Sequence, residues 1–297
     1  MKVAITGANS SVGKNLLVRL SKEEDITIVA GVRNEKVIPE LPKSPAIKPT
    51  IINYDDIKSL EKALDGADIV IHLAGILIET KHSNYANANI AATAAIVDAA
   101  KKSDVKSIIF ISVVGANPES RNAYFRSKGV AEELVLSSGL GARILRTPIL
   151  FGPNAAGSQA IIGMISSGQA KLLGGGHYQM RPLDIDDLSE ALTILCSTSI
   201  QDQVTYELVG PESAPYRDII EMTAQVMGKT IAFGNVPILL AKFGAAITSI
   251  LKGGGITPTV IDVITQDEIV KTNADSALGI TLTPMKRTLE KMTSLGD

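Results

Sequence analysis

The sequence predicts an α/β protein whose main part is a parallel sheet with helices on both faces, followed by a smaller C-terminal lobe. Two observations support this prediction. Short runs rich in β-branched residues alternate with helical stretches through the first half of the chain. These runs are apolar at almost every position, which is typical of strands that helices cover on both faces of a doubly wound sheet.

The elements follow one another in a regular order up to residue 150. Strands are expected at residues 2–6, 26–32, 50–53, 68–74, 107–113 and 142–146. Helices are expected between them at residues 12–23, 56–64, 89–103 and 126–139. Beyond residue 150, glycine-rich turns, short strands and helices follow without alternation, which indicates a second lobe.

We therefore expect a sheet domain at residues 1–150 and a smaller substrate or partner lobe at residues 151–297. Residues 181–210 include a helix for which Asp186 is the expected N-cap, and we expect this segment to pack back on the sheet domain.

The composition limits the partners of the chain. Its 297 residues are 45% hydrophobic, with 29 basic and 31 acidic residues and a formal net charge of -2. This balance favours a small-molecule substrate over nucleic acid. No cluster of His, Cys and Asp has the spacing of metal ligands, so no metal is expected.

The single cysteine, the N-terminus and the apolar stretches indicate the cellular compartment of the protein. Cys196 has no cysteine to pair with and is expected to be buried. Met1 leads directly into a strand, which leaves no room for a signal peptide. The apolar stretch Val236–Leu251 is too short to span a bilayer. We therefore expect a soluble, cytoplasmic protein.

The first strand enters the turn T-G-A-N-S-S-V-G, which opens a helix. Gly7 permits the tight turn, and Gly13 lets the helix pack close to the strand. A serine stands where nucleotide-binding turns carry their middle glycine, but at negative φ its hydroxyl and the helix amides can still face a phosphate. The residues expected to surround a dinucleotide pyrophosphate are Gly7, Asn9, Ser10, Ser11, Val12 and Gly13.

The second strand ends in V-A-G-V-R-N, without the acid that binds the ribose hydroxyls of NAD. Arg33 stands there instead and can hold a 2′-phosphate through two hydrogen bonds. This favours NADP(H) over NAD(H); the alternative is a solvated surface arginine.

These features resemble the short-chain dehydrogenase/reductase superfamily, in its extended and atypical branches. The glycine turn matches the family's TGxxGxxG motif, H-L-A-G at 72–75 matches a strand end along the cofactor, and Y-F-R-S-K supplies the Tyr-x-x-x-Lys pair. The resemblance covers nearly the whole chain. Its C-terminal part is similar to the subgroup that includes the dinucleotide-binding accessory subunit of respiratory complex I and its bacterial relatives.

The resemblance implies a set of site residues. Further cofactor contacts are expected at Asn53, Tyr54, Leu73, Ala74, Gly75, Tyr124 and Lys128. Ser112, at a strand's carboxyl end, is expected to polarise a substrate oxygen, and Asn89 to shape a helix and a proton relay. Tyr124 and Lys128 share one helix face, where the lysine is expected to lower the tyrosine pKa and favour proton transfer.

Three functions remain open at this stage. The leading one is an oxidoreductase that moves hydride between a nicotinamide and a carbonyl or alcohol. The second is a non-catalytic NADP(H)-binding accessory or sensor protein that docks a partner. The third is a sugar-nucleotide epimerase or dehydratase, although its serine-rich run and arginine clamp are missing. Substrate identity and a homodimer are left open.

Overall fold

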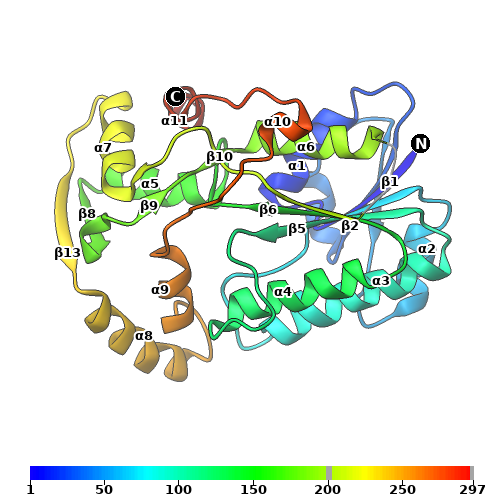
Figure 1. Ribbon diagram of the computed structural model, residues 1–297, viewed down its shortest axis with the longest axis horizontal. Coiled ribbons are helices and arrows are strands. Elements are labelled where there is room, and N and C mark those ends of the chain that lie inside the picture. The colour runs from blue at the N-terminus through cyan, green and yellow to red at the C-terminus, as the bar shows by residue number, and fades with distance from the viewer. Residues whose placement is uncertain (199–202, 295–297) are drawn as a thin grey trace. The chain divides into compact units, whose positions relative to one another are not determined.

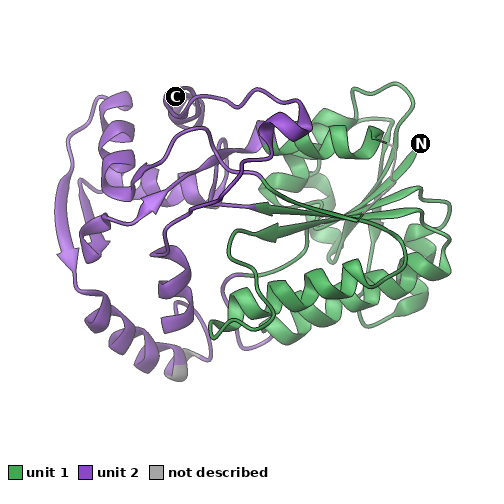
Figure 2. Cartoon of the chain, viewed as in Figure 1, with its two compact units in different colours: residues 1–76, 84–146, 188–207 green, residues 77–83, 147–187, 208–297 purple. Residues whose placement is uncertain are grey.

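The computed structural model describes residues 1–198 and 203–294. The chain forms two compact units, shown in Figure 2. Unit 1 contains residues 1–76, 84–146 and 188–207, and unit 2 contains residues 77–83, 147–187 and 208–297. Both units are therefore built from segments that are distant in the sequence.

A seven-stranded sheet forms the centre of unit 1. Its strands are β1 (Lys2–Thr6), β2 (Thr27–Val32), β3 (Ile47–Ile51), β4 (Ile69–His72), β5 (Ser107–Val113), β6 (Gly141–Thr147) and β11 (Val204–Glu207), in the spatial order β11-β6-β5-β4-β1-β2-β3. Neighbouring strands pair in parallel. The order reverses between β1 and β4, and ligands bind at the carboxyl ends of strands at such a switch point. The predicted doubly wound parallel sheet is confirmed.

Helices cover both faces of this sheet (Figure 1). On one face, α1 (Ser11–Leu20) lies with α6 (Ile185–Ser197), and the Ser189 hydroxyl donates to Asn15 Oδ1 at 2.6 Å. The other face carries α2 (Ile57–Leu64), α3 (Ala92–Lys102) and α4 (Ala123–Leu136) over an apolar core. The shorter elements are a 3₁₀ turn at Glu35–Glu40 and a π-helical turn at Ala86–Ala91.

Three elements differ from the sequence-based expectation. Strand β3 begins at Ile47, before the expected residue 50. Helix α4 begins at Ala123 because Asn122 Oδ1 accepts the amides of the next turn, so Tyr124 belongs to the helix. Asp186 was wrongly expected to be an N-cap: it lies within α6, and its own amide donates to Asp184 Oδ1 at 2.9 Å.

Unit 2 is a smaller α+β assembly. Its helices are α5 (Ala156–Ser166), α7 (Tyr216–Val226), α8 (Ile238–Lys252), α9 (Pro258–Ile264), α10 (Asp275–Leu278) and α11 (Met285–Thr293), with a 3₁₀ turn at Gly174–Gly176. Its strand pairs are β7 (Leu150–Phe151) with β10 (Leu183–Asp184), β8 (Gln169–Leu173) with β13 (Ala232–Val236), and β9 (Gln179–Met180) with β12 (Ala214–Pro215). Side chains from α5, α7, α11 and β8 share one core.

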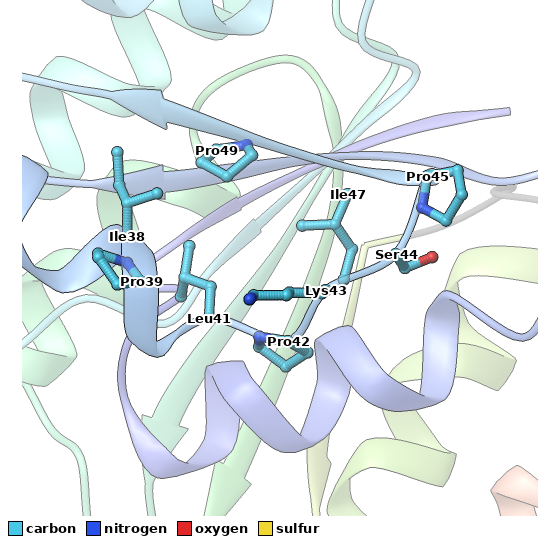
Figure 3. Close-up of a pocket in the computed structure, with 9 residues that line it drawn as sticks. All are labelled: Ile38, Pro39, Leu41, Pro42, Lys43, Ser44, Pro45, Ile47 and Pro49. Carbon is cyan, nitrogen blue, oxygen red and sulfur yellow. The ribbon is translucent and has the colours of Figure 1, made fainter.

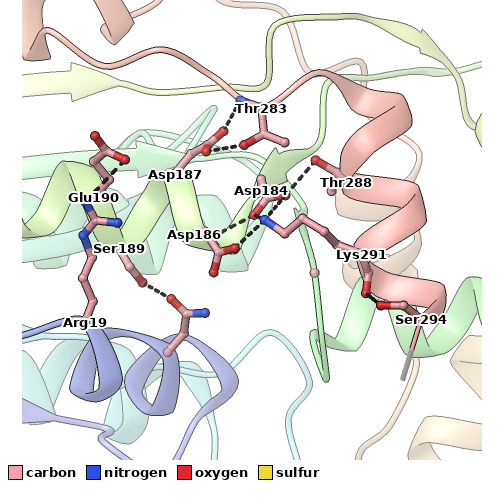
Figure 4. A network of polar contacts seen from close by, with 12 residues as sticks. Arg19, Asp184, Asp186, Asp187, Ser189, Glu190, Thr283, Thr288, Lys291 and Ser294 are labelled. Carbon is pink, nitrogen blue, oxygen red and sulfur yellow. Dashed lines mark hydrogen bonds and ion pairs between the residues drawn. The ribbon is translucent and has the colours of Figure 1, made fainter. Parts of the chain in front are cut away.

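Helix α11 is tied to the end of β10 and the start of α6 by one buried and one partly exposed carboxylate (Figure 4). Lys291 Nζ lies 2.9 Å from both oxygens of Asp184, which is fully buried, and also pairs with Asp186. The Thr288 hydroxyl donates to Asp184 Oδ2 at 2.8 Å. The carboxylate therefore has charged and neutral partners from α11, and losing the charged one leaves it only partly compensated.

Replacing Lys291 with Met is expected to lower the free energy of unfolding by about 1–3 kcal/mol. The loss stays below that of a fully buried pair because Thr288 remains and the lysine is partly exposed. Chemical denaturation measures it. Lys286→Met, on the exposed side of the same helix, is the control and should change stability by no more than about 0.5 kcal/mol. Equal losses in both variants would contradict a role for the ion pair.

Candidate dinucleotide site

The turn after β1 has the backbone geometry that a phosphate site needs. Gly7 has φ of +75°, and a methyl group added there would lie 3.1 Å from the amide nitrogen of Ala74 at the end of β4. A methyl group at Gly13 would lie 2.6 Å from the carbonyl oxygens of Gly7 and Ala8. Only glycine allows the turn, β4 and the first turn of α1 to approach this closely.

Ser10 lies at the start of α1, where the S-S-V-G sequence suits a helix N-cap. Its φ is -69°, and the sequence-based expectation requires a negative φ for this turn to face a phosphate. Its hydroxyl, however, accepts the amide of Gly13 at 3.0 Å and so caps α1. The first helical hydrogen bond runs from Lys14 to the Ser10 carbonyl, so the amides of Ser11 and Val12 precede the helical ladder and are the donors available to an anion.

Arg33 and Tyr54 lie near each other in unit 1. Arg33 directly follows β2 and is exposed. Burial raises the pKa of Tyr54, and its hydrogen bond to Thr6 and the positive charge of Arg33 partly offset this rise. Asn53 Oδ1 accepts the amide of Asp55 at 3.1 Å, so this oxygen braces the turn after β3. Arg33 is thus an exposed cation at the carboxyl end of β2.

A buried histidine connects β1, β4 and α3. Thr93 Oγ1 donates to the Asn89 carbonyl at 2.7 Å, so it accepts from His72 Nε2 at 3.1 Å. The other ring nitrogen, Nδ1, must then accept from Thr6 Oγ1 at 2.6 Å. Burial lowers the pKa of His72 to about 3, so the imidazole is neutral and its tautomer is fixed. The resemblance placed His72 in the H-L-A-G strand end along the cofactor, but it did not reveal these buried hydrogen bonds.

This histidine predicts a dependence of stability on pH. The unfolded chain binds a proton at His72 below pH 6.5, whereas the folded chain does so only near pH 3. The unfolded state takes up more protons in this window, so the free energy of unfolding falls as the pH falls. Between pH 6.5 and 4.5 the loss should be about 2 kcal/mol.

Urea unfolding of wild type and His72→Gln at both pH values checks this expectation. Burial raises the pKa of Glu268 to about 7, and this carboxyl titrates in both proteins, so it cancels in the comparison. On going from pH 6.5 to 4.5, the free energy of unfolding should fall by about 2 kcal/mol less in the variant than in the wild type. An unchanged difference would mean that His72 accepts a proton in the folded state.

Tyr124, Lys128 and Ser112 belong to two neighbouring elements of unit 1, α4 and β5. Lys128 Nζ donates to the carbonyl of Ile111 at 2.7 Å and lies 4.1 Å from the ring centre of Phe110. The ammonium group thus reaches the residue before Ser112, near the carboxyl end of β5. Tyr124, Lys128 and Ser112 are all buried.

The electrostatics of this pair differ from the sequence-based expectation. Burial, and to a lesser degree Tyr85, raises the pKa of Tyr124 above its usual value, so the prediction that Lys128 lowers it is wrong for the chain without a ligand. Burial also lowers the pKa of Lys128 to about 7, with Glu132 opposing the shift. A half-charged lysine is a weak source of phenolate stabilisation, and Tyr124 stays protonated at neutral pH.

Asn89 joins the strand end to α4. Its Oδ1 accepts the amide of Ile76 at 2.8 Å, and its Nδ2 donates to the Ile76 carbonyl at 3.1 Å and to Ser127 Oγ at 2.9 Å. A methyl group at Gly75 would lie 3.2 Å from Asn89 Oδ1 and 3.8 Å from Lys128 Nζ. Gly75, Asn89 and Lys128 are therefore neighbours. The π-helical turn that carries Asn89 is the kind often found at functional sites.

An apolar groove runs beside the free edge strand β3 (Figure 3). Its volume is about 570 Å³, and it is lined by Ile38, Pro39, Leu41, Pro42, Lys43, Ser44, Pro45, Ile47 and Pro49. It contains none of the expected site residues and only one ionisable side chain, that of Lys43. Its polar side chains are those of Lys43 and Ser44, and no carboxylate, histidine or cysteine lines it.

The turn around Gly7 and Gly13, which we call the glycine cradle, is followed by the amides of Ser11 and Val12. Together with the carboxyl ends of the parallel strands, these features define a dinucleotide-binding protein of the Rossmann type. Residues 7–169 match the protein family described as NAD(P)H-binding. Because this match covers more than half of the sequence, the chain belongs to that family. The cofactor of the site is accordingly a nicotinamide dinucleotide, which the glycine cradle and the amides of α1 fit.

Two curated relatives extend the comparison. The mitochondrial 40 kDa subunit of NADH-ubiquinone oxidoreductase from Neurospora crassa is 26% identical over 245 residues, which cover 80% of this chain and 63% of that protein. The ceramide reductase of Caulobacter vibrioides is 22% identical over 231 residues, 76% of this chain and 70% of that protein. The chain thus spans less than two thirds of the Neurospora protein.

Among solved structures, UDP-glucuronic acid 4-epimerase from Bacillus cereus in complex with NAD has a TM-score of 0.77 at 21% identity, covering 98% of this chain and 97% of that one. This similarity shows the fold. Together with the family match, it confirms the resemblance to the extended short-chain dehydrogenase/reductase branch. Across residues 1–198 and 203–294, every helix is too short or too polar to cross a membrane.

Proposed function

We propose that this chain is an NADP(H)-dependent oxidoreductase that reduces a carbonyl compound to an alcohol or catalyses the reverse reaction. The observation that carries the proposal is the position of Lys128, whose ammonium group lies beside both Gly75 at the end of β4 and the carboxyl end of β5. A cofactor in the glycine cradle extends along these strand ends in such folds. Unit 1 is then the cofactor-binding domain, and unit 2 supplies the substrate or partner surface.

Each residue has one task in the proposed reaction. The bound nicotinamide supplies the hydride in reduction. Tyr124 gives its phenolic proton to the substrate oxygen, which its protonated state at neutral pH allows. Ser112 polarises that oxygen from β5. Lys128 holds the cofactor ribose and, once charged, stabilises the phenolate that remains. Asn89 is a positioning residue that fixes α4 against Ile76.

Arg33 is proposed to favour NADPH over NADH. Arg33→Ala should weaken NADPH binding by about ten- to a hundredfold, because a charged contact to the 2′-phosphate contributes about 1.5–3 kcal/mol, and NADH binding should change little. Calorimetric titration with each cofactor measures this. Lys22→Ala, which removes an exposed charge just after the far end of α1, is the control. An equal loss for both cofactors would exclude Arg33 from reading the phosphate.

The named relatives support two versions of the function. The Caulobacter relative is named a ceramide reductase, and we therefore propose a long-chain, apolar carbonyl or alcohol as the first substrate class to test. Another is a subunit of a respiratory enzyme, and it favours a second candidate, an NADP(H)-binding accessory protein without turnover. The strong burial of Tyr124 and Lys128 is compatible with either function.

Two measurements on the purified protein test the proposal. Titration with NADPH should show saturable binding below millimolar concentration, and a panel of short and long-chain aldehydes and ketones should include one that oxidises NADPH. Binding with no turnover across the panel would favour the accessory protein. No binding at millimolar NADPH would contradict both functions.

A further inference from the structure

A hollow in unit 1, which we call the basic hollow, lies near the amino ends of β1, β2 and β3, beside helix α2. Its volume is about 500 Å³. Its polar side chains are those of Lys2, Thr27, Lys48, Thr50, Lys62 and Asp68. Sites for small molecules have volumes of about 300–1,000 Å³. The basic hollow is therefore large enough for a small molecule, and its lining suits a charged one.

The pairing of the strands places the lysines of the basic hollow together. Lys2 of β1 is aligned with Thr27 of β2, and Lys48 of β3 is aligned with Val29 of β2. Alternate residues of a strand point to the same face of a sheet, so the two lysines share one face. Lys62 comes from the last turn of α2, which packs on this face, because three residues of α2 share a core with Val29. Two strands and one helix thus contribute one lysine each.

Among the residues that the structure describes, the three lysines of the basic hollow have no carboxylate partner. Lys2 Nζ donates to the main-chain carbonyl of Asp65, which is a neutral acceptor. The carboxylate of Asp65 is exposed and forms no ion pair with the described lysines. Lys48 and Lys62 are also exposed, and neither forms an ion pair in the described part of the chain. An anion that enters the hollow therefore has no carboxylate to displace from them.

The acids closest to the lysines already have cations of their own. Asp68, which lines the hollow, has Oδ1 2.7 Å from Lys106 Nζ, and its Oδ2 accepts the amide of Lys2 at 2.9 Å. The hydrogen bond from Lys106 is the main reason that the pKa of Asp68 is lowered. Glu61 of α2 pairs with Lys102 at 3.2 Å. Because Lys102 and Lys106 lie outside the lining, the charge that remains in the hollow is positive.

We propose that the basic hollow binds a small anion that carries a diphosphate group. A lysine ammonium forms charge-assisted hydrogen bonds to phosphate oxygens, and the hydroxyls of Thr27 and Thr50 can donate as well. Three ammonium groups match the several charges of a diphosphate better than the single charge of a carboxylate. The site is separate from the glycine cradle, since Lys2 and Gly7 lie at opposite ends of β1, about 16 Å apart at about 3.3 Å per residue. The proposal therefore does not depend on the proposed reaction.

Calorimetric titration with inorganic pyrophosphate at low ionic strength tests the basic hollow. The variant with both Lys48→Met and Lys62→Met should bind pyrophosphate at least about tenfold more weakly than the wild type, because two charged contacts are lost. The matched control carries Lys22→Met and Lys58→Met, which remove two exposed charges outside the hollow, and it should match the wild type. Thermal unfolding checks that both variants are folded. A wild type that binds no pyrophosphate at millimolar concentration, or equal losses in the two variants, would overturn the proposal.

Acetylation of individual lysines, read by mass spectrometry, shows where the anion binds. Pyrophosphate should slow the acetylation of Lys48 and Lys62 and leave that of Lys22 and Lys58 unchanged. Equal protection of all four lysines, or of none, would place the anion elsewhere and contradict the site. ADP in place of pyrophosphate separates the two sources of a diphosphate. A nucleotide ligand should bind the wild type more tightly than pyrophosphate does and lose that affinity in the variant without Lys48 and Lys62, whereas weaker binding of ADP would indicate free diphosphate.

Discussion

Tyr124→Phe is expected to bind NADPH as tightly as the wild type and to lose carbonyl reduction by about 10²–10⁴-fold. The phenolic hydroxyl is needed only where the proton moves, so its loss should lower turnover and leave cofactor affinity unchanged. The ring, which packs 5.7 Å from those of Tyr85 and Phe125, is kept, so folding should be preserved. Absorbance of NADPH at saturating cofactor measures the rate.

Tyr206→Phe is the control for this variant, since Tyr206 lies on the edge strand β11 of the same unit. It should retain the wild-type rate. A Tyr124→Phe protein as active as the wild type on any accepted substrate would remove Tyr124 from the mechanism. A wild type inert on every carbonyl compound would support the accessory protein, because the fold can bind a nucleotide without using it.

Gly13→Ala should be the most damaging change in the cofactor cradle. The added methyl group would lie 2.6 Å from two carbonyl oxygens of the preceding turn, and these backbone atoms cannot move without shifting α1. We expect a loss of about 1–3 kcal/mol in the free energy of unfolding. NADPH binding should weaken at least about tenfold, because the amides of Ser11 and Val12 would be displaced.

A glycine-to-alanine substitution at Gly163 should instead raise the free energy of unfolding. Gly163 lies within helix α5, and a methyl group there would meet no atom within 4 Å. Gly163→Ala should therefore raise stability by about 0.5–1 kcal/mol, since alanine favours the helix. Chemical denaturation of both variants measures the contrast. Similar stabilities for the two would contradict the close approach at Gly13.

The sheet of unit 1 could be predicted because its strands are nearly all apolar and its helices alternate with them. Each such strand can be stable only when covered on both faces, which leaves a doubly wound parallel sheet as the solution. The ends of helices are harder to predict from the sequence where a single side chain sets them. Asn122 starts α4 three residues early by accepting two amides, and this contact depends on a rotamer that no pattern reveals.

The candidate site was only partly readable from the sequence. Gly7 and Gly13 could be assigned because their roles are local to one turn. The cap at the S-S-V-G helix start is equally local, and Ser10 makes it. The hydrogen-bonded chain through His72 could not be assigned, since it depends on which of several polar groups come together in three dimensions. The low pKa of Lys128 could not be predicted from the sequence either, because burial controls it and the spacing from Tyr124 does not.

Transfer of deuterium from NADPH that carries deuterium at both hydrogen positions of the nicotinamide C4 tests the central claim most directly. The labelled cofactor is incubated with the wild type and a carbonyl compound that it accepts, and the alcohol is analysed by mass spectrometry. Hydride transfer in the site predicts one deuterium on the former carbonyl carbon, formed by the wild type and almost absent with Tyr124→Phe. Oxidation of the cofactor with no deuterium in the alcohol, or equal labelling by the two proteins, would contradict the account.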